Sequence, residues 1–316
     1  MKKFNWRISP ANVNVDDLLQ KSSSPLHPLQ SEIWGKAKKE IHNINSLYVL
    51  ADDIKGDLAG FARIEIRYLF KILKVAWIPK GPTFIDFDNK KELIESLKNF
   101  LKSQGFILLV TDLYLERLRQ KKFKNKTILI NLKEDEKVIY KKMHQKFKYA
   151  IRRSIKEKIE FKRSKNNKDI NSFYFMCKKL SKEKKFVLPG SLELMKRLLL
   201  NEEICSKINF NLELAIYNNQ IASGAIIAFS DKRAHYLWGA TNKKLSKFGP
   251  CESLHWHIIK KAKNIGIQSY DLEGIDRFNN IGVFKFKKRM GGDIKELFGL
   301  EFYPLNIFFK FIFIIY

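Results

Sequence analysis

The sequence predicts an α+β protein built from two similar mixed α/β units. Strands and helices follow one another in two runs of the same order, and each run has a Gly-Pro pair, Gly81-Pro82 or Gly249-Pro250, between its third strand and the next helix. With 316 residues, 45% of them hydrophobic, the chain can bury a core in each of two units of about 150 residues. We interpret the repeated order as an internal duplication in which each copy is a mixed sheet flanked by helices.

The first run begins with a helix at residues 31–41, for which Ser31 is a candidate N-cap. A second helix follows at 90–102, because Leu93, Leu97 and Leu101 recur at helical spacing. The strands expected in this run cover residues 47–51, 58–68, 75–78 and 106–110.

The second run repeats this order. We expect helices at 167–182 and 191–201, strands at 212–217, 221–229 and 234–240, and then a helix to about residue 264 and a strand to 272 after Gly249-Pro250.

A basic helical segment at 134–161 lies between the two runs and has the densest cluster of positive charge, which includes Lys148 and Arg152. This cluster fits either the solvated face of a linking helix or a surface that contacts phosphates.

Sixty Lys and Arg against 33 Asp and Glu give a formal net charge of +27. Such an excess favours polyanionic partners, namely tRNA, nucleotide or lipid pyrophosphates and anionic membrane surfaces. The chain is also rich in Lys, Ile, Asn and Phe together, so a compositional bias accounts equally well for much of the excess.

Features of a secreted or membrane-spanning protein are not expected. The three cysteines form no CxxC pair, which disfavours a zinc site or a disulfide framework and fits a reducing cytoplasm. The basic N-terminus lacks the apolar stretch of a signal peptide. The apolar run at 305–316 is too short to span a bilayer, and either packs as a terminal helix or touches a membrane surface.

Four short motifs near the end of the chain resemble successive signatures of the FemABX peptidyltransferases: Tyr236–Ala240 (YLWGA), Gly249-Pro250, Tyr270–Ile275 (YDLEGI) and Phe286–Gly291 (FKKRMG). The resemblance extends over residues 30–304 and is strongest after residue 209. It implies two tandem GNAT-like acyltransferase domains, one over residues 1–145 that binds the precursor and is completed by 295–316, and one over 146–294. No heptad run long enough for the coiled-coil arm of some members appears between residues 161 and 210, so we expect an armless member.

The resemblance also implies two catalytic residues. Lys287 matches the lysine of the family's F-K-x-x-F-G motif, with Met290 in place of the second aromatic, and a fixed cation there would stabilise the charge that develops on the ester carbonyl. Asp271 is a candidate general base, since an attacking amine must lose a proton. Alternation along an extended chain would put Asp271 and Glu273 on one face.

The substrate-binding residues follow from the same resemblance. Lys38 comes four residues after Trp34, a W-x-x-x-K spacing that in the family helps to hold the precursor's pyrophosphate. Other residues of this set are Tyr236 and Trp238 at the substrate channel, and Lys148 and Arg152 in the segment that matches the start of the second lobe. Each also has an ordinary structural reading, as a surface lysine or arginine or as packing in the sheet. The spacing of His255 and His257 fits no metal motif, and we interpret both as structural.

This resemblance implies a cytoplasmic aminoacyltransferase, at the inner face of the membrane, that uses neither metal nor cofactor. It would move glycine, alanine or serine from aminoacyl-tRNA to the side-chain amine of the third stem-peptide residue of a peptidoglycan precursor, UDP-MurNAc-pentapeptide or lipid II, for cell-wall cross-bridges. One alternative is a GNAT-type N-acyltransferase with an acyl-CoA or acyl-carrier donor, although residues 246–251 keep only one glycine of the usual CoA loop. The other is a non-catalytic protein that binds RNA or a membrane surface.

Overall fold

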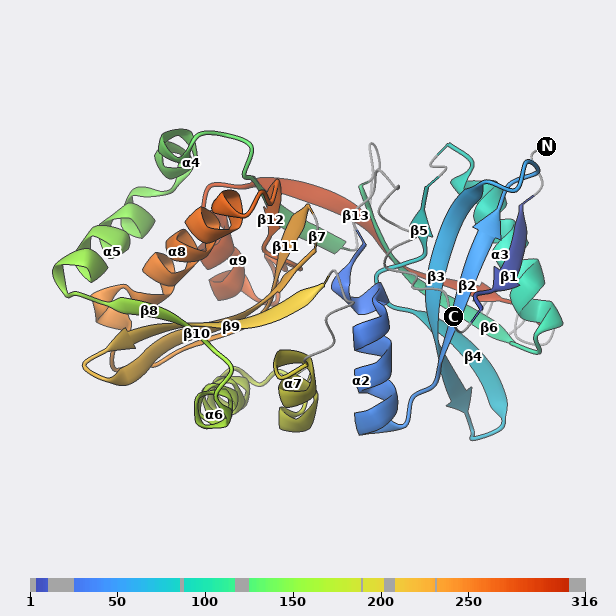
Figure 1. Cartoon of the computed structure of the whole chain (residues 1–316), viewed down its shortest axis with the longest axis horizontal. Coiled ribbons are helices and arrows are strands. Elements are labelled where there is room, and N and C mark those ends of the chain that lie inside the picture. Colours follow the sequence, from blue (N-terminus) through green and yellow to red (C-terminus); the bar gives the residue numbers. More distant parts are fainter. Residues whose placement is uncertain are drawn as a thin grey trace. The chain divides into compact units, whose positions relative to one another are not determined.

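Two compact units make up the structure (Figure 1), a computed structural model that describes residues 4–10, 26–85, 88–116, 125–188, 190–201, 208–230 and 232–306. Unit 1 comprises Met1–Asn125 with Glu296–Tyr316, and unit 2 comprises Lys126–Lys295.

The sheet of unit 1 has the strand order β1-β2-β3-β4-β6-β13, and the short β5 pairs with β3. Neighbouring strands are antiparallel except β4 and β6, which are parallel. The strands are β1 (Asn5–Ile8), β2 (Ser46–Asp52), β3 (Leu58–Leu69), β4 (Leu73–Ile78), β5 (Thr83–Phe84), β6 (Leu108–Glu116) and β13 (Asp293–Pro304). The helices of this unit are η2 (Pro28–Gln30), α2 (Glu32–His42) and α3 (Lys90–Ser103).

The two faces of this sheet differ in chemistry. Alternation along β3 turns Ala62 and Ile64 toward an apolar core that includes three fully buried leucines of α3, at positions 93, 97 and 101. The residues that alternate with them, Arg63 and Glu65, are charged and buried on the opposite side. There α2 packs closely, because Gly35 leaves room that a Cβ atom would take from the Tyr48 hydroxyl. The sequence therefore places a polar network under α2.

The sheet of unit 2 has the order β7-β12-β11-β10-β9-β8, in which only β11 and β12 are parallel. Its strands are β7 (Asn125–Asn131), β8 (Glu160–Ser164), β9 (Asn209–Tyr217), β10 (Gln220–Phe229), β11 (Arg233–Thr241) and β12 (Ser269–Asp271). Its helices are α4 (Glu136–Lys142), α5 (Gln145–Lys156), α6 (Asn167–Lys184), α7 (Leu192–Leu199), η3 (Ser246–Phe248), α8 (Pro250–Asn264) and α9 (Ile281–Lys288).

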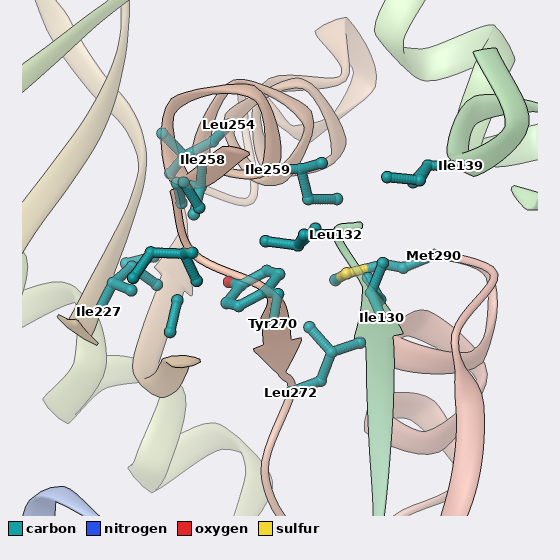
Figure 2. Close-up of a cluster of buried hydrophobic side chains, with 14 of the residues drawn as sticks. Ile130, Leu132, Ile139, Ile227, Leu254, Ile258, Ile259, Tyr270, Leu272 and Met290 are labelled. Atoms are coloured by element: carbon teal, nitrogen blue, oxygen red, sulfur yellow. The ribbon is translucent and has the colours of Figure 1, made fainter. Parts of the chain in front are cut away.

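The core of unit 2 surrounds Tyr270 of β12. Figure 2 shows Leu254, Ile258 and Ile259 of α8 facing Tyr270, with Leu132 between them. All of these side chains are buried. Burying this many apolar groups is the main stabilising contribution to the unit, and it fixes β12 firmly beneath α8.

The predicted α+β class and the repeated order are confirmed. In unit 1 the chain runs from β4 past Gly81-Pro82 to α3 and then to the parallel β6, and in unit 2 it runs from β11 past Gly249-Pro250 to α8 and the parallel β12. The expected helices and the strands before each crossover agree with the structure to within a few residues.

Three expectations need correction. The segment at 134–161 is not one helix, because Met143 and His144 separate α4 from α5. A boundary was expected between residues 145 and 146, but the two units divide between residues 125 and 126, since β7 pairs with β12 and contributes Ile128 and Ile130 to the unit 2 core. Helix α9 and the strands β1, β5, β7, β8 and β13 are absent from the prediction.

The apolar tail at 307–316 lies outside the described residues. Within the part of the chain that is described, no helix combines the length and the apolar character needed to cross a bilayer.

Candidate active site

Lys287 is buried on α9, although two neighbouring lysines on the same helix are not. Its exposed fraction is 7%, whereas Lys285 and Lys288 are exposed. Its Nζ atom donates to the carbonyl oxygens of Gly274, at 2.8 Å, and Glu273, at 3.3 Å. Burial lowers the pKa of Lys287 to about 8, while the negative charges of Glu273 and Asp271 act in the opposite direction. The side chain is thus a fixed cation at neutral pH, and it loses its proton at a lower pH than an ordinary lysine does.

The backbone at Glu273 turns these carbonyl groups toward Lys287. Glu273 has φ +59°, a left-handed conformation that a residue with a side chain adopts at some energetic cost. Two contacts hold it: its backbone N–H donates to Asp271 Oδ1 at 2.7 Å, and its Oε1 lies 2.7 Å from Nδ1 of the buried His235. Strain of this kind is commonly retained where it serves a site.

Asp271 supports this turn from inside the unit. Its side chain is fully buried, and its Oδ1 accepts from the Thr127 hydroxyl as well as from the Glu273 N–H. The expectation that Asp271 and Glu273 share one face of an extended chain is wrong, because β12 ends at Asp271 and the left-handed Glu273 turns the chain. A buried carboxylate with these partners is better suited to positioning the loop at Lys287 than to contacting a substrate amine.

A set of rings packs beside Lys287. The Lys287 Nζ lies 5.7 Å from the centre of the Tyr236 ring, and His255 packs edge-on against the same ring at 4.6 Å. Gly239 makes this possible, because a Cβ atom there would lie 1.8 Å from the Tyr236 hydroxyl. Burial raises the pKa of Tyr236 well above its ordinary value, so the phenol stays neutral. Tyr236 and Lys287, separated by 51 positions in sequence, are therefore brought together as predicted members of one site.

His255 is buried in the structural role expected from the sequence. Its Nδ1 lies 2.9 Å from the Tyr270 hydroxyl, with which it shares a hydrogen bond. Burial, and to a smaller degree the charge of Lys287, lowers the pKa of His255 to about 3. The imidazole is consequently neutral at physiological pH and adds no second charge next to Lys287.

The remaining predicted residues of unit 2 lie in different surroundings. Trp238 is buried on β11 with its ring against Gly190, where a Cβ atom would come within 3.1 Å. Lys148 reaches from α5 to the carbonyl oxygen of Lys141 at 3.1 Å and so caps the end of α4. Arg152 is exposed on α5. Trp238 thus packs within the unit, which was the alternative reading of the sequence, whereas the contact of Lys148 with α4 was not expected.

In unit 1, the predicted Lys38 lies above the charged side of β3. Trp34 is buried on the same helix, whereas Lys38 is half-buried. Burial lowers the pKa of Lys38, the charge of Glu65 opposes this, and the cations Arg67 and Arg63 reinforce it. Lys38 is therefore held near other cations, an arrangement that an anionic ligand would relieve.

The buried end of this cluster is rigid. The Arg63 guanidinium donates to the Leu29 carbonyl oxygen at 2.8 Å, to Ser46 Oγ at 2.9 Å and to Glu65 Oε1 at 3.0 Å. The other oxygen of Glu65 accepts from Arg67, whose side chain is 43% exposed. One carboxylate thus joins two guanidinium groups, which leaves the cluster with an excess of positive charge once Lys38 is included.

The part of the chain that carries the Lys287 site is similar to a known family. Residues 205–316 match the model of the FemAB family. Over this span, the chain is similar to the FemAB family. The match includes Tyr236, Trp238, Asp271 and Lys287, so the resemblance predicted from the motifs is confirmed.

Curated relatives match a short part of the chain. An 89-residue stretch is 32% identical to the lipid II:glycine glycyltransferase of Staphylococcus saprophyticus, and this stretch is 27% of the present chain and 21% of that protein. The match thus spans about a fifth of the length of this relative.

The fold agrees over a much longer range. The crystal structure of FemX superposes with a TM-score of 0.80 at 15% identity, covering 98% of this chain and 99% of that one. A tandem GNAT protein from the clavulanic acid biosynthesis pathway superposes with a TM-score of 0.50 at 7% identity, covering 97% and 99%. The chain therefore has the mixed α+β fold of FemX and of tandem GNAT proteins.

The surroundings of Lys287 contain residues that sequence reasoning did not assign to this site. These groups hold Lys287 or its loop through tertiary contacts or through the backbone, and no local sequence pattern predicts them. They are His235, Thr127 and the carbonyl groups of residues 273 and 274. A weak signal was available for Glu273, because YDLEG has its glycine directly after the residue that takes a left-handed conformation.

Proposed function

We propose that this chain is an aminoacyltransferase that moves one amino acid of the glycine, alanine or serine class from aminoacyl-tRNA to the side-chain amine of the third stem-peptide residue of a peptidoglycan precursor. The observation that carries the proposal is the buried Lys287 ammonium, held by two carbonyl groups within the FemAB-matched part of the chain. The likeness to a lipid II:glycine glycyltransferase supports the choice of donor and acceptor.

The chemistry requires little beyond position and charge. The acceptor amine, once it has lost a proton, attacks the ester carbonyl carbon; a C–N bond forms, the ester C–O bond breaks, and the terminal ribose oxygen of the tRNA gains a proton. Negative charge develops on the carbonyl oxygen in the transition state. Lys287 would stabilise that charge more than it stabilises the ground state, and its orientation by the 273–274 carbonyls avoids reorganisation during the reaction.

Each unit would have its own share of the substrates. Lys38 and Arg67 in unit 1 would bind the diphosphate of UDP-MurNAc-pentapeptide or lipid II, since that cluster has more positive than negative charge. In unit 2, Tyr236 and Trp238 would line the path of the stem peptide, and Lys148 and Arg152 would contact tRNA phosphates. Asp271 would act by positioning the loop that holds Lys287.

An acyl-CoA donor has less support. In GNAT enzymes a glycine-rich loop before the crossover helix presents free amides to the pyrophosphate, whereas here Pro250 removes one amide at the start of α8. Gly249 is buried with its Cα against the backbone of Ala150, whose carbonyl oxygen would lie 2.3 Å from a Cβ atom. The start of α8 is thus occupied by α5.

A product assay tests the proposal. The purified full chain would be incubated with a pool of charged tRNA and, separately, with UDP-MurNAc-pentapeptide and with lipid II, and the products would be weighed by mass spectrometry. We expect the precursor mass to rise by one amino-acid residue, with fragmentation placing the addition on the third stem residue. Transfer from an acyl-CoA in a parallel reaction, with none from tRNA, would overturn the proposal in favour of an N-acyltransferase.

A further inference from the structure

The hairpin between β3 and β4 presents an apolar tip to solvent. Within five consecutive positions, Tyr68 is 56% exposed, Leu69 39%, Phe70 78% and Ile72 77%. We call residues 67–74 the hairpin tip. Single exposed hydrophobic residues are ordinary, but four so close together form a patch that usually has a partner.

The hairpin tip extends beyond the part of the sheet that helices cover. The residues of β3 from Ala59 to Glu65 are buried, whereas those from Arg67 onward are exposed. Since successive residues of a strand point to opposite faces, exposure at consecutive positions means that both faces are open there. The pairs Leu69–Leu73 and Tyr68–Lys74 continue the antiparallel register into this open part. The tip is therefore an ordered projection from unit 1 (Figure 1).

The turn residues are unusual for a tight hairpin. Phe70 and Lys71 have φ values of 51° and 66°, which are the left-handed conformations of a tight hairpin turn that Asn and Gly favour. A bulky aromatic residue at such a position is strained, and here it gains no burial in return. Neither packing nor turn chemistry explains Phe70.

The charge around the tip has one sign. Residues 66–85 contain no Asp or Glu but four cations, at Arg67, Lys71, Lys74 and Lys80. Lys71 is exposed directly beside Phe70. Lys80 pairs with Asp112, and Lys74 lies over the Phe106 ring, so these two are engaged within the unit. Arg67 pairs with Glu65, so Lys71 remains as the exposed cation that faces a partner together with the apolar residues.

We propose that the hairpin tip docks this protein on an anionic phospholipid bilayer, with Phe70 and Ile72 inserted at the boundary of headgroups and acyl chains and Lys71 against lipid phosphates. Apolar side chains next to lysines are the combination that holds peripheral proteins at such a surface. A second copy of the chain fits less well, since a twofold contact through the tip would bring Arg67 and Lys71 near their own equivalents. RNA also fits less well, because Leu69 and Ile72 have no π face on which a base could stack.

The inference stands on the hairpin tip alone and does not require the proposed transferase activity. It concerns a different segment from the apolar tail at residues 307–316. If both proposals hold, the hairpin tip would bring the chain to the surface where a lipid-linked acceptor resides.

Vesicle flotation with the full chain tests the inference. Vesicles of phosphatidylcholine alone would be compared with vesicles that also contain phosphatidylglycerol. We expect the wild type to float with the anionic vesicles, and the double variant Phe70→Ser/Ile72→Ser to lose at least about tenfold in partition coefficient. Lys71→Glu should weaken binding to anionic vesicles by about tenfold and leave any binding to neutral vesicles unchanged.

The matched control is Ile54→Ser, which replaces an aliphatic residue of the same unit that is 69% exposed but lies at the other end of β3, in the β2–β3 turn. It should float like the wild type. The substitutions are all at exposed positions, and equal urea midpoints would show that folding is intact. Equal flotation of the double variant and the wild type, or no flotation of the wild type, would overturn the inference. The inference would also be overturned if the double variant lost a concentration-dependent dimer or tRNA binding while its vesicle binding stayed unchanged.

Discussion

The ammonium group of Lys287 donates to the carbonyl oxygen of Gly274 at 2.8 Å, so a cation on α9 is held by the backbone of a loop 13 positions earlier in the chain. The loop is itself held by the Asp271 carboxylate, which accepts from the Glu273 N–H. The Lys287 ammonium that we assign to catalysis is thus held in place by backbone carbonyl groups. A substitution can test the contribution of each contact.

Replacing Lys287 should separate chemistry from tRNA binding. We expect Lys287→Met to lower the rate of transfer about 10²- to 10³-fold, as the loss of one oxyanion-stabilising group does, with the affinity for charged tRNA changed little. The control is Lys285→Met, on the same helix but exposed. Single-turnover transfer and filter binding would measure the two quantities. An unchanged transfer rate in Lys287→Met would remove this lysine from the mechanism.

The same substitution should stabilise the fold at neutral pH. The pKa of Lys287 is about 8 in the folded chain and near 10.4 when unfolded, so the unfolded state binds more protons between these values and stability rises with pH there. Below pH 8 the buried charge costs roughly 3 kcal/mol. Lys287→Met should therefore unfold at higher urea concentration than the wild type at pH 7, and the difference should vanish near pH 10.5. A difference that stays constant with pH would show that Lys287 is not buried as a cation.

Asp271 should behave as a positioning residue. Thr127→Val removes the hydroxyl that donates to Asp271 and touches no reacting group, so we expect a loss of about 1–3 kcal/mol in unfolding free energy and a moderately lower turnover. Asp271→Asn should lower turnover but keep the shape of the pH–rate profile. If Asp271 were the general base, its replacement would instead abolish the acidic limb of that profile.

Acid should weaken unit 2 through His255. Because the pKa of His255 is about 3 in the fold and near 6.5 when unfolded, the unfolded state takes up one more proton as the pH falls below 6.5. This lowers the unfolding free energy by about 1.4 kcal/mol per pH unit. His255→Leu should flatten the slope between pH 6.5 and 5, whereas His144→Asn, which keeps the N-cap of α5, should not. Equal slopes in all three proteins would contradict the assignment.

Lys38 should act on precursor binding alone. We expect Lys38→Met to raise the KM for the precursor about tenfold, with kcat and the KM for charged tRNA unchanged, since one cation beside Arg67 would be lost from a diphosphate site. Lys36→Met, two positions earlier and exposed, is the control. A selective rise in the KM for tRNA would place the RNA, not the precursor, at this cluster.

Much of the fold could be predicted because local signals agree with it. Ser31 caps α2 through the Trp34 N–H, and the leucines at 93, 97 and 101 form the buried stripe of α3, as their spacing predicts. The edge strands β1 and β8 are short and mostly exposed, so they lack the apolar alternation that identifies a strand.

The site was less predictable, because burial there depends on tertiary contacts. Lys285, Lys287 and Lys288 are alike in local sequence, and only the packing of α9 buries one of them. Glu273 was expected in an extended chain, but the Asp271 carboxylate and the His235 ring hold it in a turn. The resemblance to a family identified Lys287, whereas the groups that hold it are evident only from the folded structure.

The pairing of β13 with β6 has a consequence for biosynthesis. The sheet of unit 1 is translated first but includes β13, at residues 293–304. The edge of β6 therefore lacks its partner strand until unit 2 has been translated completely. Stalled nascent chains that end before residue 293 should accordingly show a protease-sensitive amino-terminal half beside a largely resistant second one. If the amino-terminal half of such chains were already resistant, translation order would not govern how this molecule matures.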